Sequence, residues 1–172
     1  FTERYQTDTL NKIAQMVQTF SKVLDTEKLE RINSLDDFMN DDYLSIRDQA
    51  HSALNYNRDK WNEGYYVALY KVRDDQVYSI MYYNDQVGQY PFVDYMDKGS
   101  YFYQIYNEGK TLTDKISSFE GDYLYGMGPV YNKEGKIVAI IEVGTDMYGF
   151  MEENLKLVKS LFIETLTMLV IL

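Results

Sequence analysis

The chain has 172 residues, a net charge of −10 and no cysteine. The absence of cysteine excludes disulfides, thiolate nucleophiles and cysteine-based metal sites. An acidic surface repels the phosphate backbones of nucleic acids, so we expect no nucleic-acid partner.

The first third of the chain has a helical pattern. Apolar residues recur there at three- and four-residue spacing and form one stripe, made of Leu10, Ile13, Val17, Phe20 and Leu24. This spacing predicts a long amphipathic helix over residues 9–28. After a predicted loop at residues 34–40, a second helix is predicted over residues 41–57, because two aspartates at its start complement the helix dipole.

The apolar period then changes to two, which indicates strands. Tyr65–Val72 and Val77–Tyr83 are predicted strands joined by a polar four-residue turn, which is typical of a hairpin. Residues 84–99 contain two glycines and a proline and are expected to be irregular. Residues 100–108 are predicted to form a short helix, with a serine as its N-cap and a glycine just past its end.

Three further strands are predicted in the second half of the chain, at Lys110–Ser118, Asp122–Tyr131 and Lys136–Val143. The turn between the last two contains Gly135, which is available for a positive φ angle. From Tyr148 the helical period returns. Consecutive strands joined by hairpins imply an antiparallel sheet with helices on one face, which is an α+β architecture.

We therefore expect one domain over residues 1–160, with helices within residues 9–57 and the sheet within residues 62–147. Residues 161–172, LFIETLTMLVIL, are predicted to be an exit helix and contain nine apolar residues. This segment alone is too short to span a bilayer, which needs about 20 residues. It is interpreted either as the start of a transmembrane helix or as the buried end of an ordinary helix.

Few residues are suited to catalysis. His51 is the single histidine and lies in a predicted helix, whereas a metal site or a catalytic triad needs several converging partners. The paired acidic residues lie at helix starts or in turns, where aspartate is favoured for local reasons. Gly126 and Gly128 lie inside a predicted strand, so they admit either a packed helix or a ligand and do not form a phosphate loop. No cofactor, metal or catalytic residue is predicted, which favours a binding module over an enzyme.

The segment Gly126–Asp146, GMGPVYNKEGKIVAIIEVGTD, resembles the Cache family of PAS-like extracytoplasmic sensor domains. The resemblance lies in Pro-Val-Tyr at 129–131, Glu-Gly-Lys at 134–136 and the closing Asp146, and the segment Asp97–Lys110 is similar to the family's preceding stretch. It implies a PAS-like central antiparallel sheet of about five strands, a long N-terminal helix and a C-terminal exit helix. It also implies transmembrane segments on both sides of the domain, and we expect a homodimer formed through the N-terminal helix.

The resemblance implies only part of a ligand site. Asp146 matches the family's closing aspartate, whereas the family's arginine position falls near Lys98 and its Tyr-x-Asp pair falls near Ser117, so the carboxylate-binding arginine has no counterpart. Strand alternation places Tyr123, Tyr125 and Met127 on one face, and one of the two faces is expected to line the pocket. The predicted ligand-binding residues are Asp146, Tyr101, Phe102, Lys98, Tyr82, Tyr66, Tyr123 and Ser117.

Two functions of different classes follow. The first is the extracytoplasmic sensor domain of a receptor such as a chemoreceptor, histidine kinase or diguanylate cyclase, which binds a small molecule and passes the signal through its terminal helices. The alternative is a PAS-like dimerisation or protein-interaction module that holds no small ligand. A third and weaker interpretation, a small hydrolase or lyase, requires converging titratable groups that the sequence does not reveal.

Overall fold

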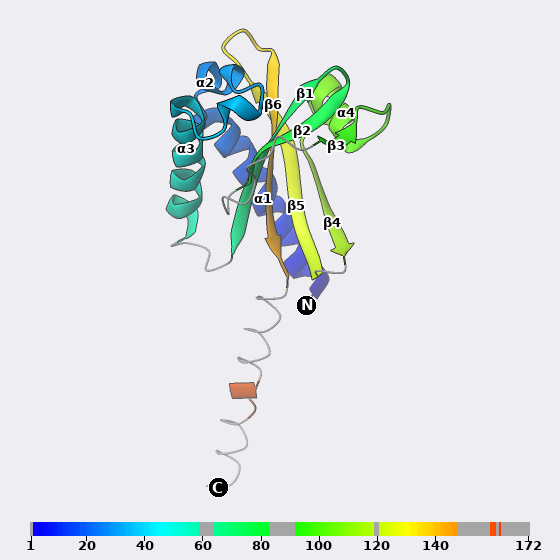
Figure 1. Cartoon of the computed structure of the whole chain (residues 1–172). Helices are drawn as coiled ribbons and strands as arrows, with labels where there is room; N and C mark the ends of the chain where they lie inside the picture. The colour runs from blue at the N-terminus through cyan, green and yellow to red at the C-terminus, as the bar shows by residue number, and fades with distance from the viewer. Residues whose placement is uncertain are drawn as a thin grey trace, which may run out of the picture.

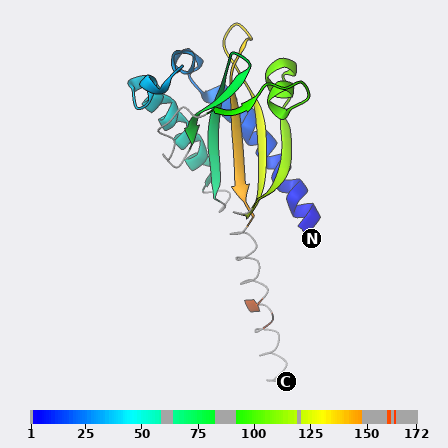
Figure 2. The ribbon, with the colours of Figure 1, turned by 45° about the vertical axis from the view of Figure 1, so that its right-hand side comes forward.

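The computed structural model describes residues 2–58, 64–82, 92–118 and 121–147, together with residues 159, 160 and 162. A curved antiparallel sheet forms the centre, and a long N-terminal helix lies across one of its faces (Figures 1 and 2). This arrangement confirms the predicted α+β architecture.

Helices make up the first third of the chain. Helix α1 spans Thr2–Val23, α2 spans Thr26–Arg31, and α3 spans Asp41–Arg58 after a 3-10 turn at Leu35–Asp37. The single helix predicted over residues 9–28 is therefore wrong at its end, because a break separates α1 from α2. The side chain of Asp25 causes a new helix to begin there, since its Oδ1 accepts a hydrogen bond from the Lys28 amide at 3.2 Å.

The sheet contains six strands in the order β3-β2-β1-β6-β5-β4, and every neighbouring pair is antiparallel. Helix α4 is inserted between β3 and β4 and contacts β5 and β6. The bounds of these elements are β1 Tyr65–Arg73, β2 Gln76–Tyr82, β3 Phe92–Tyr95, α4 Tyr101–Glu108, β4 Leu112–Ser118, β5 Gly121–Tyr131 and β6 Ile137–Asp146.

Strand β3 lies within the stretch that was predicted to be irregular. It has only four residues, all of them exposed, so it lacks the apolar alternation by which a strand is recognised in a sequence. It pairs with β2 at the edge of the sheet, and the ring of Phe92 contacts that of Tyr78 at a centroid distance of 6.2 Å. The strand therefore depends on its partner and not on its own pattern.

The connections follow the predicted turn chemistry. Asp74 and Asp75 have φ angles of 51° and 57°, which makes the first hairpin a two-residue turn, shorter than the four residues expected. Gly135 has a φ of 79°, as its position in the second hairpin predicts. Helix α4 has the predicted caps, because Ser100 accepts a hydrogen bond from the Tyr103 amide and Gly109 is left-handed.

Helix α1 packs closely on β5 because two glycines there leave room for it. A Cβ on Gly126 would lie 2.7 Å from Ile13 Cγ2, and one on Gly128 would lie 2.6 Å from Val17 Cγ1. Both distances are shorter than atoms in a packed interior allow. Of the two interpretations of these glycines, helix packing is the one that the structure supports.

The end of the chain was predicted to be an exit helix. Residues 159, 160 and 162 are helical, and the rest of the segment 161–172 lies outside the described residues. Within the part of the chain that the structure describes, no helix is both long enough and apolar enough to cross a membrane. The transmembrane interpretation of this segment stays a prediction.

Candidate functional site

The sheet face that α1 leaves uncovered, called the second face below, has its own buried cluster. Strand alternation gives this face the residues expected from the sequence, since Tyr66, Ala68 and Tyr70 of β1 and Tyr125 and Met127 of β5 point the same way. Helix α4 packs on it through residues that include the fully buried Ile105. The second face therefore combines a buried apolar cluster under α4 with a group of tyrosine side chains.

A carboxyl group lies in the middle of the second face. Glu142 of β6 is only 8% exposed, and it pairs with Ala68 on one side and Met127 on the other. The Tyr66 hydroxyl donates to Glu142 Oε1 at 2.6 Å, and the Tyr70 hydroxyl donates to Oε2 at 2.7 Å. Burial raises the pKa of Glu142, while the two tyrosine hydrogen bonds oppose that rise. The site thus holds a carboxyl group that keeps its proton to a higher pH than an exposed one.

A glycine makes the Tyr66 contact possible. Gly144 of β6 pairs with Tyr66 of β1, and a Cβ at Gly144 would collide with the Tyr66 ring. Since only glycine leaves this space, the ring lies flat over β6 and its hydroxyl reaches Glu142.

A second carboxylate, Asp114, lies on β4, which is separated from the strand of Glu142 by β5. The Tyr101 hydroxyl of α4 donates to Asp114 Oδ2 of β4, and Asp114 pairs in register with Tyr125 of β5. Burial, followed by Asp114, Tyr101 and Glu142, raises the pKa of Tyr125 to about 12. The pKa of Tyr125 is therefore affected by both carboxylates.

Ser79 adds an unsatisfied polar atom to the same face. It pairs with Tyr70 and is 4% exposed, and its Oγ has no hydrogen-bond partner among the described residues. Buried hydroxyls in native proteins are nearly always paired, so this hydroxyl can accept a hydrogen bond from a water molecule or a ligand.

The structure brings five of the eight predicted site residues to this face. Tyr66 bonds Glu142, Tyr101 bonds Asp114, and Phe102 packs edge-on against Tyr70 at a centroid distance of 5.5 Å. Tyr123 and Asp146 pair with each other at the end of the sheet where β6 finishes, with Asp146 exposed.

The other three predicted residues are not brought into this cluster. Ser117 pairs with Asp122 and so lies on the α1 side of β4, where its hydroxyl helps to lower the pKa of Asp122 after Lys115. Lys98 is exposed in the loop ahead of α4. The backbone of Tyr82 pairs with Ala68, and its side chain lies outside the described part.

Sequence reasoning missed the residue at the centre. Glu142 is the single charged residue within IVAIIEVG, a run that is otherwise apolar or glycine. A charge inside a buried strand requires partners, because its desolvation costs several kcal/mol. That pattern was available in the sequence, but its partners, Tyr66 and Tyr70, are 76 and 72 residues away.

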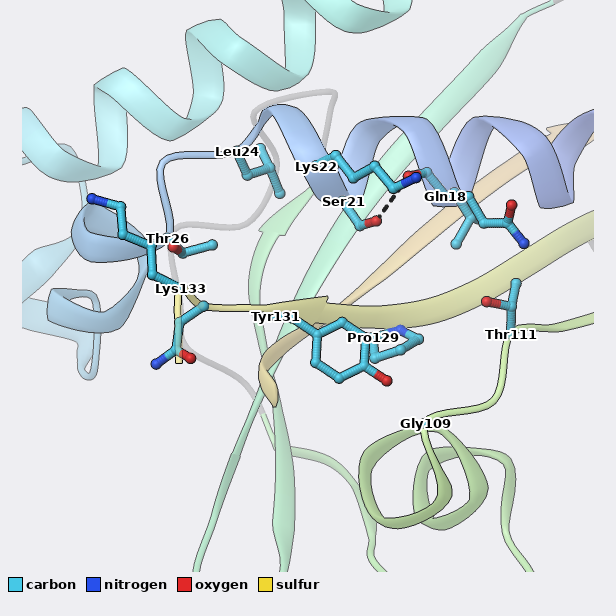
Figure 3. A pocket seen from close by; sticks show the side chains of 12 residues that line it. Gln18, Ser21, Lys22, Leu24, Thr26, Gly109, Thr111, Pro129, Tyr131 and Lys133 are labelled. Carbon is cyan, nitrogen blue, oxygen red and sulfur yellow. Dashed lines mark hydrogen bonds between the residues drawn. The ribbon is translucent and has the colours of Figure 1, made fainter. Parts of the chain in front are cut away.

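A pocket of about 570 Å³ also lies on the α1 side, between the C-terminal half of α1 and the end of β5 (Figure 3). The two lysines that line this pocket, Lys22 and Lys133, do not point their amines into it. Lys133 forms an ion pair with Glu27 at 2.5 Å, and Figure 3 shows the Lys22 amine lying along α1 beside Gln18. The hydrogen bond drawn there, from Ser21 Oγ to the Gln18 carbonyl oxygen at 3.1 Å, belongs to the helix itself. We therefore take the second face as the candidate site.

The titratable residues of the described part do not form a metal centre. No group of three or more histidine, cysteine or acidic side chains converges there in a way that could hold a metal ion.

Comparisons with known proteins identify the fold. The sequence matches no known family and no curated protein. The structure is similar to the sensor domain of E. coli DcuS, with a TM-score of 0.52 and 12% identity, over 86% of this chain and 95% of that chain. Two weaker likenesses each have a TM-score of 0.41. One is to the periplasmic sensory domain of the Campylobacter jejuni chemoreceptor Tlp1, with 15% identity over 84% of this chain and 57% of that chain. The other is to the ligand-binding domain of the Pseudomonas aeruginosa amino-acid chemoreceptor PctC in complex with GABA, with 12% identity over 87% of this chain and 63% of that chain. The chain has the fold of the DcuS sensor domain, as the sequence resemblance implied.

Proposed function

We propose that this chain is the extracytoplasmic sensor domain of a membrane receptor and that it binds a small molecule on the second face of its sheet. The observation that carries the proposal is the likeness to the DcuS sensor domain, which extends over 95% of that domain. A sensor domain leaves catalysis to other parts of its receptor, so we assign no reaction to this chain.

The second face is a better ligand site than the α1 face. The α1 face is filled by aliphatic side chains that contact glycines, whereas the second face buries Glu142 and leaves the Ser79 hydroxyl without a described partner. A carboxyl group inside a sheet does not improve stability over an apolar residue of the same size. Its presence there is therefore better explained by binding than by folding.

The ends of the chain offer a route for the signal. The start of α1 and the end of β6 lie at the same end of the molecule (Figure 1), and Gln6 Nε2 donates to the Met147 sulfur at 3.8 Å. A ligand that shifts β6 against α1 would move the two segments that leave the domain. We propose that these segments lead to flanking membrane helices and that α1 forms the homodimer contact.

A melting screen tests the proposal. The chain is heated with amines, carboxylates and sugars, and a compound present at 100 times its Kd raises stability by about 2.7 kcal/mol, or about 5–10 °C. The Tyr66→Phe variant keeps the ring but loses the hydroxyl, so it should reduce that rise. Tyr131→Phe, on a tyrosine of the α1-side pocket, is the matched control and should leave the rise unchanged.

Two results would contradict the proposal. One is that no compound of the three classes raises the melting temperature, which would favour the interaction module without a ligand. The other is a rise that Tyr131→Phe removes and Tyr66→Phe does not, which would place binding in the pocket of Figure 3.

A further inference from the structure

We infer that the ligand of the second face is a small organic cation held by Glu142, and that its binding is coupled to pH through this buried carboxyl group. The inference rests on the proposed function and adds the ligand's chemical class and a coupling to pH.

Among the described strand residues, the charged side chains that strand alternation places on the second face are acidic. Glu142 and Asp146 of β6 and Asp114 of β4 are the acidic groups, and no lysine or arginine of the described residues contributes to the pKa of Glu142. Of the two cations on β1, Lys71 lies on the opposite face, where its Nζ donates to the Glu30 carbonyl oxygen at 3.1 Å, and Arg73 at the strand end pairs with Asp74. A ligand that carried a carboxylate to this place would be repelled, whereas a cation would be attracted.

The hydrogen-bonding groups favour a ligand that donates. A carboxylate offers about four acceptor positions, and the hydroxyls of Tyr66 and Tyr70 use one on each oxygen of Glu142. The Ser79 hydroxyl, which has no partner among the described residues, can accept as well. An ammonium group supplies up to three N–H donors, and aromatic ring faces attract it further.

The proton on Glu142 couples binding to pH. Its burial raises the pKa, so in acid the empty site holds a neutral carboxyl group that a cation binds weakly. A bound cation favours the ionised form, and the proton is released to solvent. Affinity for a cation should therefore rise with pH, by up to about tenfold per unit below the raised pKa, and level off above it.

The other titratable groups near Glu142 change this expectation little. Those on the elements packed against it are Tyr66 and Tyr70 of β1, Tyr125 of β5, Asp114 of β4, Asp146 of β6, and Tyr101 and Tyr106 of α4. The hydrogen bond to Asp114 raises the pKa of Tyr101, and burial raises that of Tyr125, so both stay protonated across the neutral range. The two aspartates are less buried than Glu142.

The test is titration calorimetry with three two-carbon probes, namely ethanolamine, ethylene glycol and glycolate, between pH 5.5 and 8.5. Ethanolamine should bind at least tenfold more tightly than the other two, with affinity rising across the acid half of that range. Titrations in two buffers of different ionisation enthalpy should record proton release in that half. This readout uses the unmodified chain and does not depend on a variant that folds.

A pair of variants tests whether cation binding depends on Glu142 itself or on the net negative charge of the chain. Glu142→Gln keeps the size and one acceptor, and it should weaken ethanolamine binding at least tenfold and remove the pH dependence. Glu134→Gln, on an exposed turn residue, is the control of equal charge change and should leave both unchanged.

Other results would overturn the inference and leave different parts of the account standing. Tighter binding of glycolate, or ethanolamine binding without proton release in acid, contradicts the inference but leaves a ligand site in place. Binding of none of the three probes overturns the inference as well, and the melting screen then decides separately whether the proposed function survives.

Discussion

The sheet has two faces of different composition. Under α1, the side chains of Ile13 and Val17 contact strand glycines, and the buried cluster of this face is apolar. Under α4, two tyrosines hold a buried carboxyl group, and a neighbouring serine has no described partner. Because both faces belong to the same strands, the difference is set by alternate residues along each strand. One face secures the fold, and the other bears the groups that a ligand can use.

The largest loss of stability is expected from a substitution at Gly126, a glycine on the α1 side of the sheet. Gly126→Ala places a Cβ 2.7 Å from Ile13 Cγ2 and should lower the free energy of unfolding by about 1–3 kcal/mol, measured by urea denaturation. Gly64→Ala is the control, because no atom lies within 4 Å of its added Cβ, and it should change stability by less than about 0.5 kcal/mol. Equal losses in the two variants would mean that close packing of α1 is unimportant.

A smaller effect on stability is expected from Lys71, a cation that is buried on the α1 side. Desolvation lowers the pKa of Lys71 from 10.5 to about 8, although Glu30 and Asp37 partly oppose this. Between these two values the unfolded chain binds more protons than the folded chain, so the Lys71 contribution to stability increases as pH rises from about 8 to 10.5.

The variant Lys71→Met should remove that increase, as measured by urea denaturation at pH 7.5 and 9.5. Lys136→Met, on an exposed residue, is the control and should keep the increase. A Lys71→Met curve parallel to that of the unmodified chain would contradict the assigned shift.

Local pattern predicted much of the fold. Alternation placed Tyr123, Tyr125 and Met127 on one face of β5, and the glycines of β5 were expected to admit either a packed helix or a ligand. The break at Asp25 was missed because the apolar stripe of α1 runs up to the buried Leu24, directly before it, and gives no sign of a helix end. Local capping by a single side chain outweighed the periodicity there.

The candidate site was harder to predict because it depends on pairing between distant strands. Which tyrosine reaches Glu142 follows from the neighbouring positions of β1 and β6, which are far apart in the sequence. Register also decides that Ser117 lies on the α1 side and not beside Tyr123. A shift of one residue in β4 would reverse that assignment, and no local pattern fixes it.

The location of binding can be measured with methionine methyl groups. Met127 is buried on the second face, whereas Met16 and Met81 are buried on the α1 side. In a chain labelled with 13C at the methionine methyls, the compound with the largest effect in the melting screen is added, and each resonance is assigned by a Met→Leu variant. The account predicts a shift of the Met127 resonance with Met16 and Met81 unchanged. A shift of Met16 or Met81 with Met127 unchanged would contradict it.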